Sequence, residues 1–140
     1  MTPVGLRLFQ SRFMRFALVG GAGFVVNEAV LVACLEAVHL NKYQAWLPAF
    51  LVSVTFTWWG NRTLTFREFA AKRGLALEWA SFVAANSMGA VANAGMYYAL
   101  VRFAPPPLGN PLVALAAGTL TGLAFNFAAS KRFVFRDRSS

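Results

Sequence analysis

One acidic side chain stands inside an otherwise apolar stretch of this sequence. Glu28 belongs to the apolar run Phe16–Leu35. A rise of 1.5 Å per helical residue would place it about 18 Å from Phe16, slightly beyond the middle of a bilayer. An ionised side chain at that depth costs a membrane helix roughly 3 kcal/mol. Such a residue is typical of a proton carrier or of a partner for a polar headgroup. The structural alternative is that Glu28 holds helices together by pairing with Asn86 or Asn93.

Two asparagines, Asn27 and Asn93, also lie within apolar runs. Hydrogen bonds between helices would explain both side chains. The functional interpretation is a polar cavity that a hydrophilic group crosses. We therefore take Asn27, Glu28 and Asn93 as candidate substrate-binding residues in the middle of the membrane.

A second set of polar residues lies near the ends of the apolar runs. Cations with amide donors beside them suit a phosphate or pyrophosphate group. We expect these side chains to converge if the two halves of the chain pack around a central axis. The alternative for each cation is an ordinary anchor at the anionic leaflet. The set consists of Thr57, Asn61, Arg62, Asn126, Lys131 and Arg132.

Motifs for covalent catalysis do not occur in the sequence. We find no nucleophile–base pair, carboxylate dyad, glycine-rich phosphate loop or metal-ligand spacing. Cys34 is the single cysteine and His39 the single histidine, which excludes an internal disulfide and argues against a metal site. We therefore expect no catalytic residue, no metal and no cofactor, in a protein that is not an enzyme.

The composition is that of a membrane protein. Of 140 residues, 58% are hydrophobic and 13% charged, which leaves too little polar surface for a soluble domain of this size. The net charge of +8 sits in short clusters between apolar stretches. Such clusters are expected beside an anionic leaflet, so we do not expect a nucleic-acid partner.

Four apolar runs predict four transmembrane helices in an all-α integral membrane protein. About 20 helical residues cross a hydrocarbon core of about 30 Å. The second run is shorter than that, but its continuation through Gly60–Phe66 would let Arg62 reach the headgroups. The runs are Phe16–Leu35, Tyr43–Trp59, Trp79–Val101 and Pro111–Ala129.

The connections between these runs differ in character. Glu36–Lys42 and Ala104–Asn110 read as short loops, the latter broken by three prolines. The middle connection, Arg67–Glu78, is longer and charged, and its apolar spacing fits either a helix in the membrane interface or irregular structure. The same two alternatives hold for the N-terminal stretch with Leu6 and Phe9.

The distribution of lysine and arginine predicts the orientation. Eleven of the 13 lie before the first run, after the second or after the fourth, which leaves only Lys42 and Arg102 for the other side. Positive residues concentrate on the cytoplasmic side. Both termini and the middle connection are therefore predicted to be cytoplasmic, in a bacterial-type inner membrane.

The sequence contains an internal repeat. A shift of 66 residues overlays the first run on the third, so that Phe16 falls on Phe82 and Asn27 on Asn93. A shift of 69 overlays the second run on the fourth, so that Phe66 falls on Phe135. We predict a single domain, residues 1–140, of two helical hairpins, about 13–67 and about 79–136, related in parallel by an axis along the membrane normal.

Small residues recur every fourth position in the second and fourth runs. This spacing places them on one helix face, where they let two helices approach closely in lipid. Close packing is the main interpretation of these stripes, and Gly118-xxx-Gly122 is the strongest form. The stripes are Ala49, Ser53, Thr57 and Asn61, and Ala114, Gly118, Gly122, Asn126 and Ser130.

Three motifs give the chain a resemblance to the GtrA-like family, small four-helix membrane proteins that also occur fused to dolichol-phosphate-mannose-type synthases. They are Arg15-Phe16-x-x-x-Gly20-Gly21, Phe56-x-x-x-x-Asn61-Arg62-x-x-x-Phe66, and Phe125-Asn126-x-x-x-Ser130-Lys131-Arg132-Phe133-Val134-Phe135. The resemblance covers about residues 13–136. Two positions depart from the pattern: Ser130 stands where the second copy usually has asparagine, and Leu64 replaces an aromatic residue.

The resemblance implies that the protein flips a polyprenyl-phosphate-linked sugar across the membrane for cell-surface polysaccharide synthesis or modification. The headgroup would enter at the Arg62 and Arg132 end and cross past Glu28, while the prenyl tail stays in lipid. Partners would be the lipid-linked sugar and membrane lipids, with a membrane glycosyltransferase and a homo-oligomer as further expectations. Two alternatives stay open: a proton-coupled multidrug-type exporter, and a non-transporting anchor for a glycosyltransferase.

Overall fold

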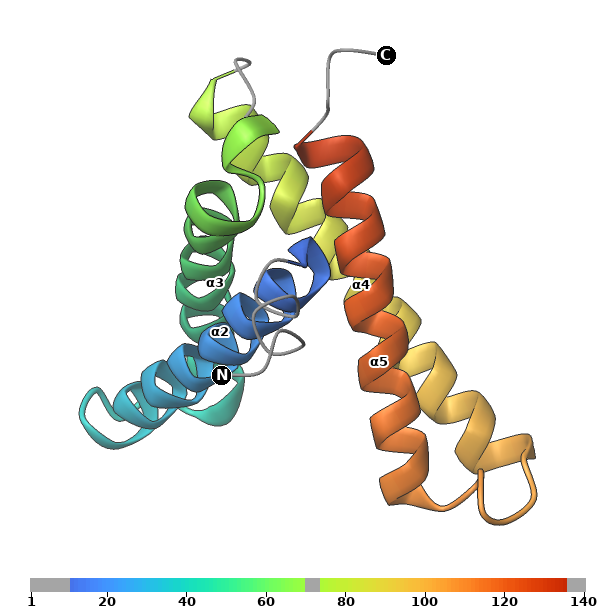
Figure 1. The fold of residues 1–140 in the computed structure, drawn as a ribbon. Helices are drawn as coiled ribbons and strands as arrows, with labels where there is room; N and C mark the ends of the chain where they lie inside the picture. Colours follow the sequence, from blue (N-terminus) through green and yellow to red (C-terminus); the bar gives the residue numbers. More distant parts are fainter. Residues whose placement is uncertain (1–10, 70–73, 136–140) are drawn as a thin grey trace, which may run out of the picture. The chain divides into compact units, whose positions relative to one another are not determined.

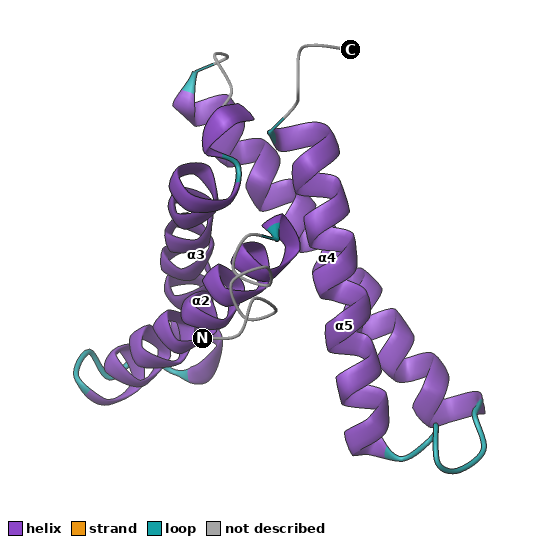
Figure 2. Ribbon diagram, viewed as in Figure 1, coloured by secondary structure: helices purple, strands orange, loops and turns teal. Residues whose placement is uncertain are grey.

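The structure is a computed structural model that describes residues 11–69 and 74–135. The part of the chain so described is helical and contains no strand (Figures 1 and 2). Its four long helices are α2 (Arg12–Glu36), α3 (Lys42–Gly60), α4 (Leu75–Phe103) and α5 (Pro111–Ala129). The predicted all-α fold with four helices is confirmed, and the range of α5 coincides with the predicted apolar run.

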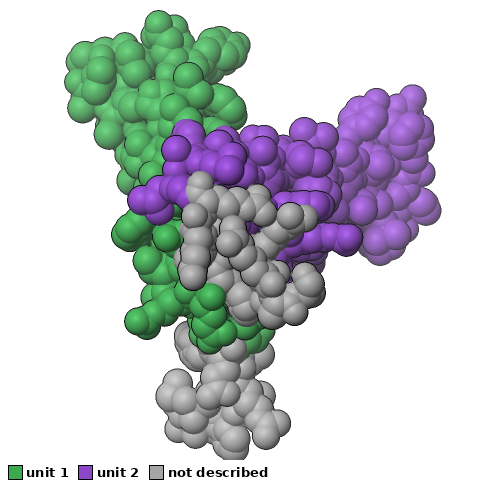
Figure 3. Space-filling model, turned by 90° about the horizontal axis from the view of Figure 1, so that it is seen from above, with its two compact units in different colours: residues 1–72 green, residues 73–140 purple. Residues whose placement is uncertain are grey.

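The chain divides into two compact units, Met1–Lys72 and Arg73–Ser140 (Figure 3). In the first unit α2 packs on α3, and we call this pair the first hairpin. In the second unit α4 packs on α5, and we call this pair the second hairpin. Each hairpin overlaps the range predicted for one repeat, and the repeat itself stays a prediction. The parallel relation of the repeats and the cytoplasmic position of both termini stay predictions.

Three helical segments are long and apolar enough to cross a membrane: Arg12–Glu36, Leu75–Phe103 and Pro111–Val134. The helix α3 is not among them. Its 19 residues include Gln44, Pro48 and three tryptophans, which lower its mean hydropathy. Tryptophan favours the membrane interface rather than the hydrocarbon core. Length and composition thus meet the prediction for three helices, and the crossing of α3 stays a prediction.

Local sequence signals explain where the helices begin. Asn41 accepts hydrogen bonds from the amides of Tyr43 and Gln44, and the Gln44 side chain accepts from the Asn41 amide in return. This capping box satisfies amides that the first helical turn leaves unpaired. At α5, Asn110 caps the helix and Pro111 occupies its first turn, where a missing amide does no harm.

Each hairpin ends in a short π-helical turn. These turns, η1 (Asn61–Thr65) and η3 (Ser130–Val134), continue α3 and α5 directly. The amide of Phe66 donates to the carbonyl of Asn61, and that of Phe135 donates to the carbonyl of Ser130, both at 2.8 Å. The predicted continuation of the second run beyond Gly60 is confirmed. The same irregularity occurs at positions that differ by 69 residues.

The wide turns bring a phenylalanine ring back onto the partner helix. Phe66 packs on Phe16 of α2, and Phe135 packs on Phe82 of α4, each pair with ring centroids 6.2 Å apart. All four rings are buried. Tilted or edge-to-face aromatic pairs of this kind add about 0.5–1.5 kcal/mol beyond the area they bury. An equivalent aromatic contact therefore closes the end of each hairpin.

Small residues form the seam between the helices, as the stripes predict. In the first hairpin the Ser53 hydroxyl donates to the Gly23 carbonyl at 2.7 Å, and a side chain at Gly23 would overlap the methyl group of Thr57. In the second hairpin a methyl group at Gly118 would lie 2.8 Å from the Asn93 carbonyl oxygen. Close helix packing is thus confirmed for these positions.

Neither of the two alternatives for the middle connection, an interfacial helix or irregular structure, describes its second half. Leu75, Leu77 and Glu78 belong to the first turn of α4, which starts earlier than the apolar run because Gly74 precedes it with a φ of +94°. Only a short 3-10 turn, η2 (Arg67–Phe69), comes before it. Residues 70–73, and Leu6 and Phe9 of the N-terminal stretch, lie outside the described residues.

Candidate functional site

The polar pair in the middle of α2 is accessible within the first unit. The Glu28 side chain is exposed and Asn27 is half-buried. The Asn27 amide donates to the Glu28 carboxylate at 3.4 Å, a long hydrogen bond between neighbours on one helix. A carboxylate has about four acceptor positions, and this single bond uses one of them. The arrangement leaves Glu28 able to accept hydrogen bonds from a hydroxylated ligand.

The corresponding residue of the second hairpin, Asn93, has a different environment. It is half-buried, and its Cβ and carbonyl group lie against Gly122 and Gly118 of α5. Asn93 and Tyr97 contribute the polar groups of an otherwise apolar pocket of about 520 Å³ between α4 and α5. Asn93 therefore takes part both in helix packing and in the lining of this pocket. The rest of the lining is formed by Ala90, Ala94, Pro111, Leu112 and Leu115.

At the end of α3, the three predicted residues serve different purposes. Thr57 is buried, and its hydroxyl donates to the carbonyls of Ser53 and Val54 within its own helix. Asn61 is 1% exposed and accepts a hydrogen bond of 2.8 Å from the Thr65 hydroxyl. Arg62 is half-buried on the π-helical turn. Thr57 and Asn61 thus support the hairpin, and Arg62 is the member of the three with a partly accessible cation.

The second hairpin presents its cations more openly. Lys131 and Arg132 are both exposed on η3. Two neutral groups behind them are buried: among the described residues, neither Oδ1 of Asn126 nor Oγ of Ser130 has a hydrogen-bond partner. The carbonyl oxygen of the Asn126 amide also lies close to Gly89 of α4. Of the six predicted residues, three lie on the first hairpin (Thr57, Asn61 and Arg62) and three on the second (Asn126, Lys131 and Arg132). The convergence of all six stays a prediction.

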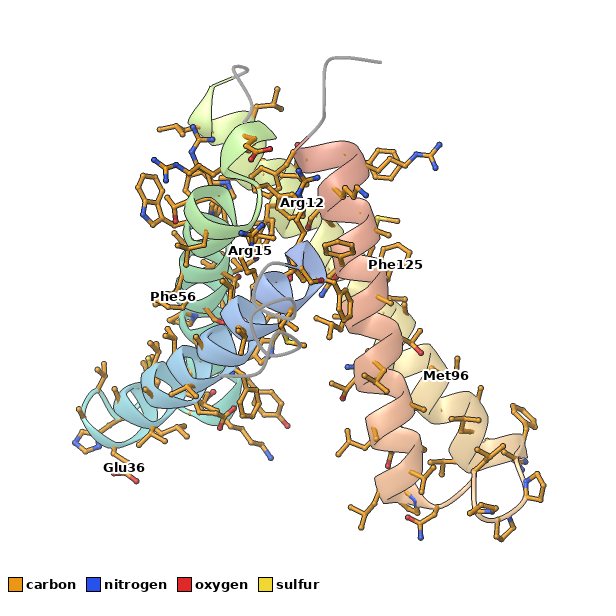
Figure 4. The ribbon with its side chains drawn as sticks, viewed as in Figure 1. Arg12, Arg15, Glu36, Phe56, Met96 and Phe125 are labelled. Atoms are coloured by element: carbon orange, nitrogen blue, oxygen red, sulfur yellow. The ribbon has the colours of Figure 1, made fainter. Side chains whose placement is uncertain are left out.

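A basic pocket in the first unit was not anticipated from the sequence. It encloses about 400 Å³ and is lined by Arg12, Arg15, Thr63, Leu64, Thr65, Arg67 and Glu68. Figure 4 labels Arg12 and Arg15, which both project from the start of α2. In the sequence, both arginines count towards the predicted orientation and Arg15 also belongs to a family motif, but neither was a candidate binding residue. The signal was their spacing, because residues three apart on a helix share a face.

A buried acid was also missed. Glu78, in the first turn of α4, is 2% exposed. A carboxylate in that position is favoured by the positive end of the helix dipole. Under the shift of 66 residues, Glu78 is the counterpart of Arg12. The starts of α2 and α4 therefore carry a basic and an acidic residue at equivalent positions of the predicted repeat.

No group of three histidine, cysteine or acidic side chains is placed to hold a metal ion within residues 11–69 and 74–135. The polar features of both hairpins are instead amides, hydroxyls, lysine and arginine cations, and single carboxylates. Such groups bind by hydrogen bonds and charge.

Comparison with curated proteins finds relatives that match almost the whole chain. A bactoprenol-linked glucose translocase of Shigella phage SfII is 26% identical over 126 residues, which cover 89% of this chain and 95% of the relative. The prophage bactoprenol-linked glucose translocase homolog of Escherichia coli K12 is 26% identical over 125 residues, with the same coverage. The bactoprenol-linked glucose translocase of Shigella flexneri is 24% identical over 137 residues, which cover 97% of this chain and all of the relative.

A family model gives the same answer independently of these pairwise matches. The model of the GtrA/DPMS transmembrane domain matches residues 15–135. This range begins at Arg15, in the first turn of α2, and ends at Phe135, so it covers nearly all of both hairpins and both π-helical turns. The resemblance seen in the sequence motifs is confirmed. The chain is a membrane protein of the GtrA/DPMS transmembrane domain family.

Proposed function

We propose that this protein moves a polyprenyl-phosphate-linked sugar from the inner to the outer leaflet of a bacterial cytoplasmic membrane, for the synthesis or modification of a cell-surface polysaccharide. One observation carries the proposal: relatives that match 89–97% of the chain are named as translocases of bactoprenol-linked glucose, or as a homolog of one. The proposed step moves a lipid and breaks no covalent bond, so the protein is not an enzyme.

The geometry of the first hairpin supports such a route. A sugar carries hydroxyl donors that need acceptors when they leave water. The exposed Glu28 carboxylate offers acceptors at a depth where α2 is otherwise apolar. We place the sugar against Asn27 and Glu28 during passage, with Asn93 on the second hairpin as a further polar contact.

The entry point would lie at the ends of α3 and α5. Arg62, Lys131 and Arg132 carry cations on or near the surface of their hairpins, and guanidinium groups bind phosphate in two-pronged fashion. The prenyl chain would stay in the surrounding lipid, since four helices enclose too little space for it. Assembly of several copies and contact with a membrane glycosyltransferase are part of the same proposal.

A leaflet-accessibility assay tests the function. The purified full-length chain is reconstituted into phosphatidylcholine liposomes that contain undecaprenyl-phosphate glucose, and periodate, which does not cross the membrane, is added for short times. Periodate oxidises the vicinal diols of glucose in the outer leaflet only. We expect the protein to expose the inner-leaflet pool to oxidation much faster than in protein-free liposomes. The proposal fails if the two preparations behave alike.

The same preparation separates the alternatives. A protein that only anchors a glycosyltransferase would leave the sugar lipid in place without its partner. A proton-coupled exporter would instead exchange cationic dyes for protons, which dye-loaded liposomes with a pH gradient detect. If Arg62→Ala and Glu28→Ala both leave transport of the sugar lipid intact, the route proposed through these residues is wrong.

A further inference from the structure

The basic pocket of the first unit combines positive charge with a concave surface. It is formed by two arginines of α2, the π-helical turn η1 and the 3-10 turn η2, so residues more than 50 positions apart in sequence meet there. Three of its lining residues are arginines and one is a glutamate, which gives it a net positive charge. The volume of about 400 Å³ is that of a small-ligand site.

Arg15 has hydrogen-bonding capacity that the described residues do not use. Its Nε atom is buried and has no acceptor among residues 11–69 and 74–135. Arg15 as a whole is half-buried, and an unsatisfied donor on its guanidinium group is unfavourable, so an incoming anionic oxygen would relieve it. The threonine hydroxyls of the pocket are engaged elsewhere, since Thr63 donates to the Trp59 carbonyl and Thr65 donates to Asn61. The arginines are therefore the donors that a ligand would meet.

One carboxylate, that of Glu68, already lies in the pocket, which indicates that the pocket accommodates an anionic group. Nη2 of Arg12 lies 3.4 Å from a carboxylate oxygen of Glu68, and the Glu68 side chain is 79% exposed. An ion pair so open to solvent contributes little to stability. A group with more negative charge than a carboxylate could therefore displace Glu68 from Arg12 at little cost.

A general need for positive charge beside the membrane does not account for this arrangement. The second hairpin has Glu78 where the first has Arg12, and Ser81 where the first has Arg15. Glu78 is buried and Ser81 half-buried at the start of α4. The two arginines are thus a property of the first hairpin alone, although both hairpin ends are predicted to face the same leaflet.

We propose that the basic pocket of the first hairpin binds the phosphate group of a lipid headgroup, with Arg15 as the central contact and Glu68 as an internal competitor. The inference rests on the proposed function in one respect, because it assigns the phosphate of the lipid-linked sugar to this pocket before the sugar passes Glu28. An anionic phospholipid carries the same phosphate chemistry, so the test includes both lipids.

The experiment measures which lipids stay bound. The full-length chain is placed in phosphatidylcholine nanodiscs with undecaprenyl phosphate or phosphatidylglycerol at equal mole fraction, and native mass spectrometry counts the retained lipids. We expect Arg15→Gln to weaken retention about tenfold, as the loss of a charge-assisted hydrogen bond would. Glu68→Gln should tighten it about threefold, because the competing charge is gone.

Arg102→Gln is the matched control. It removes the same charge at the last turn of α4, where Arg102 is exposed and far along the chain from the pocket. We expect retention to stay at the level of the unmodified chain. The tighter lipid retention expected for Glu68→Gln cannot result from misfolding, because an unfolded variant would not bind lipid more tightly.

The outcomes separate the proposal from its rivals. If undecaprenyl phosphate is retained more strongly than phosphatidylglycerol, and Arg15→Gln abolishes this retention, the pocket is assigned to the lipid-linked sugar. If both lipids are retained equally, and the same variant abolishes the retention of both, the pocket is assigned to headgroup phosphates in general. Unchanged retention in Arg15→Gln, or an equal loss in Arg102→Gln, overturns the pocket. If the pocket fails while the periodate assay still reports transport, the proposed function stands; if transport is absent while retention depends on Arg15, only the proposed function falls.

Discussion

The rings of Phe16 and Phe66 pack edge to face, with their centroids 6.2 Å apart and their planes inclined by 68°. Phe66 is 1% exposed although it follows the last turn of the first hairpin. The π-helical turn places it there, since its amide reaches back five residues to Asn61. The ring of Phe66, which follows a helix in the sequence, is thus buried at the end of the first hairpin.

Replacement of Phe66 should destabilise the first hairpin. We expect Phe66→Ala to lower the free energy of unfolding by about 1–3 kcal/mol, less than a core phenylalanine of a soluble protein, because lipid replaces part of the lost contact. Steric trapping in bicelles measures the change. Phe133→Ala is the control, since that ring is 57% exposed; an equal loss in both variants would contradict the role given to Phe66.

The seam of the second hairpin should not tolerate added volume at Gly118. A methyl group there would lie 2.6 Å from Oδ1 of Asn93 and 2.8 Å from its backbone oxygen, and the backbone cannot move aside as a side chain can. We expect Gly118→Ala to destabilise the protein by about 1–3 kcal/mol in the same unfolding assay. Gly95→Ala, at a position with no neighbouring atom within 4 Å, should be neutral or slightly stabilising because alanine favours the helix.

The hydrogen bond from Ser53 to the Gly23 carbonyl joins the helices of the first hairpin. Bonds between membrane helices contribute about 0.6–1.7 kcal/mol, and we expect Ser53→Ala to lose an amount in that range. Thr55→Ala is the comparison variant, because the Thr55 hydroxyl donates to Leu51 within α3 itself. If both substitutions have the same effect, the bond between the helices contributes nothing of its own.

The carboxylate of Glu28 should matter for transport more than for stability. Its side chain is exposed and makes a long hydrogen bond with Asn27, so we expect Glu28→Gln to leave unfolding nearly unchanged. The substitution removes a charged acceptor for sugar hydroxyls and should slow the periodate-detected transport about tenfold or more. Glu36→Gln, at the exposed end of the same helix (Figure 4), should transport at the normal rate. Equal rates in the two variants would remove Glu28 from the route.

Much of the fold could be predicted from the sequence because the signals are local. Asn110 followed by Pro111 fixed the start of α5, and the spacing of Gly118 and Gly122 indicated a close helix contact. The sequence matches Phe16 to Phe82 and Phe66 to Phe135 between the predicted repeats, but it does not indicate that Phe16 packs on Phe66. The contact itself depends on a π-helical turn, for which the residues Asn61–Thr65 carry no recognised sequence signal.

The candidate site was predictable only in part, for a related reason. Glu28 stands out from its apolar neighbours, so one sequence position suffices to find it. The basic pocket requires Arg15 and Arg67 to lie close together in space, and nothing in either segment of the sequence indicates that they do. Thr57 differs from Glu28: it is polar in the sequence, but it is buried and its hydroxyl donates within its own helix, and its role at the site stays a prediction.

The order in which the chain is made gives the contacts of the first hairpin a further meaning. Ser53 with Gly23, Asn61 with Thr65, and Phe16 with Phe66 all join residues before position 70. A ribosome has therefore supplied every participant before it translates Leu75, the first residue of α4. The first hairpin can therefore form these contacts without any residue of the second, and Phe66 is the last of their participants to be translated.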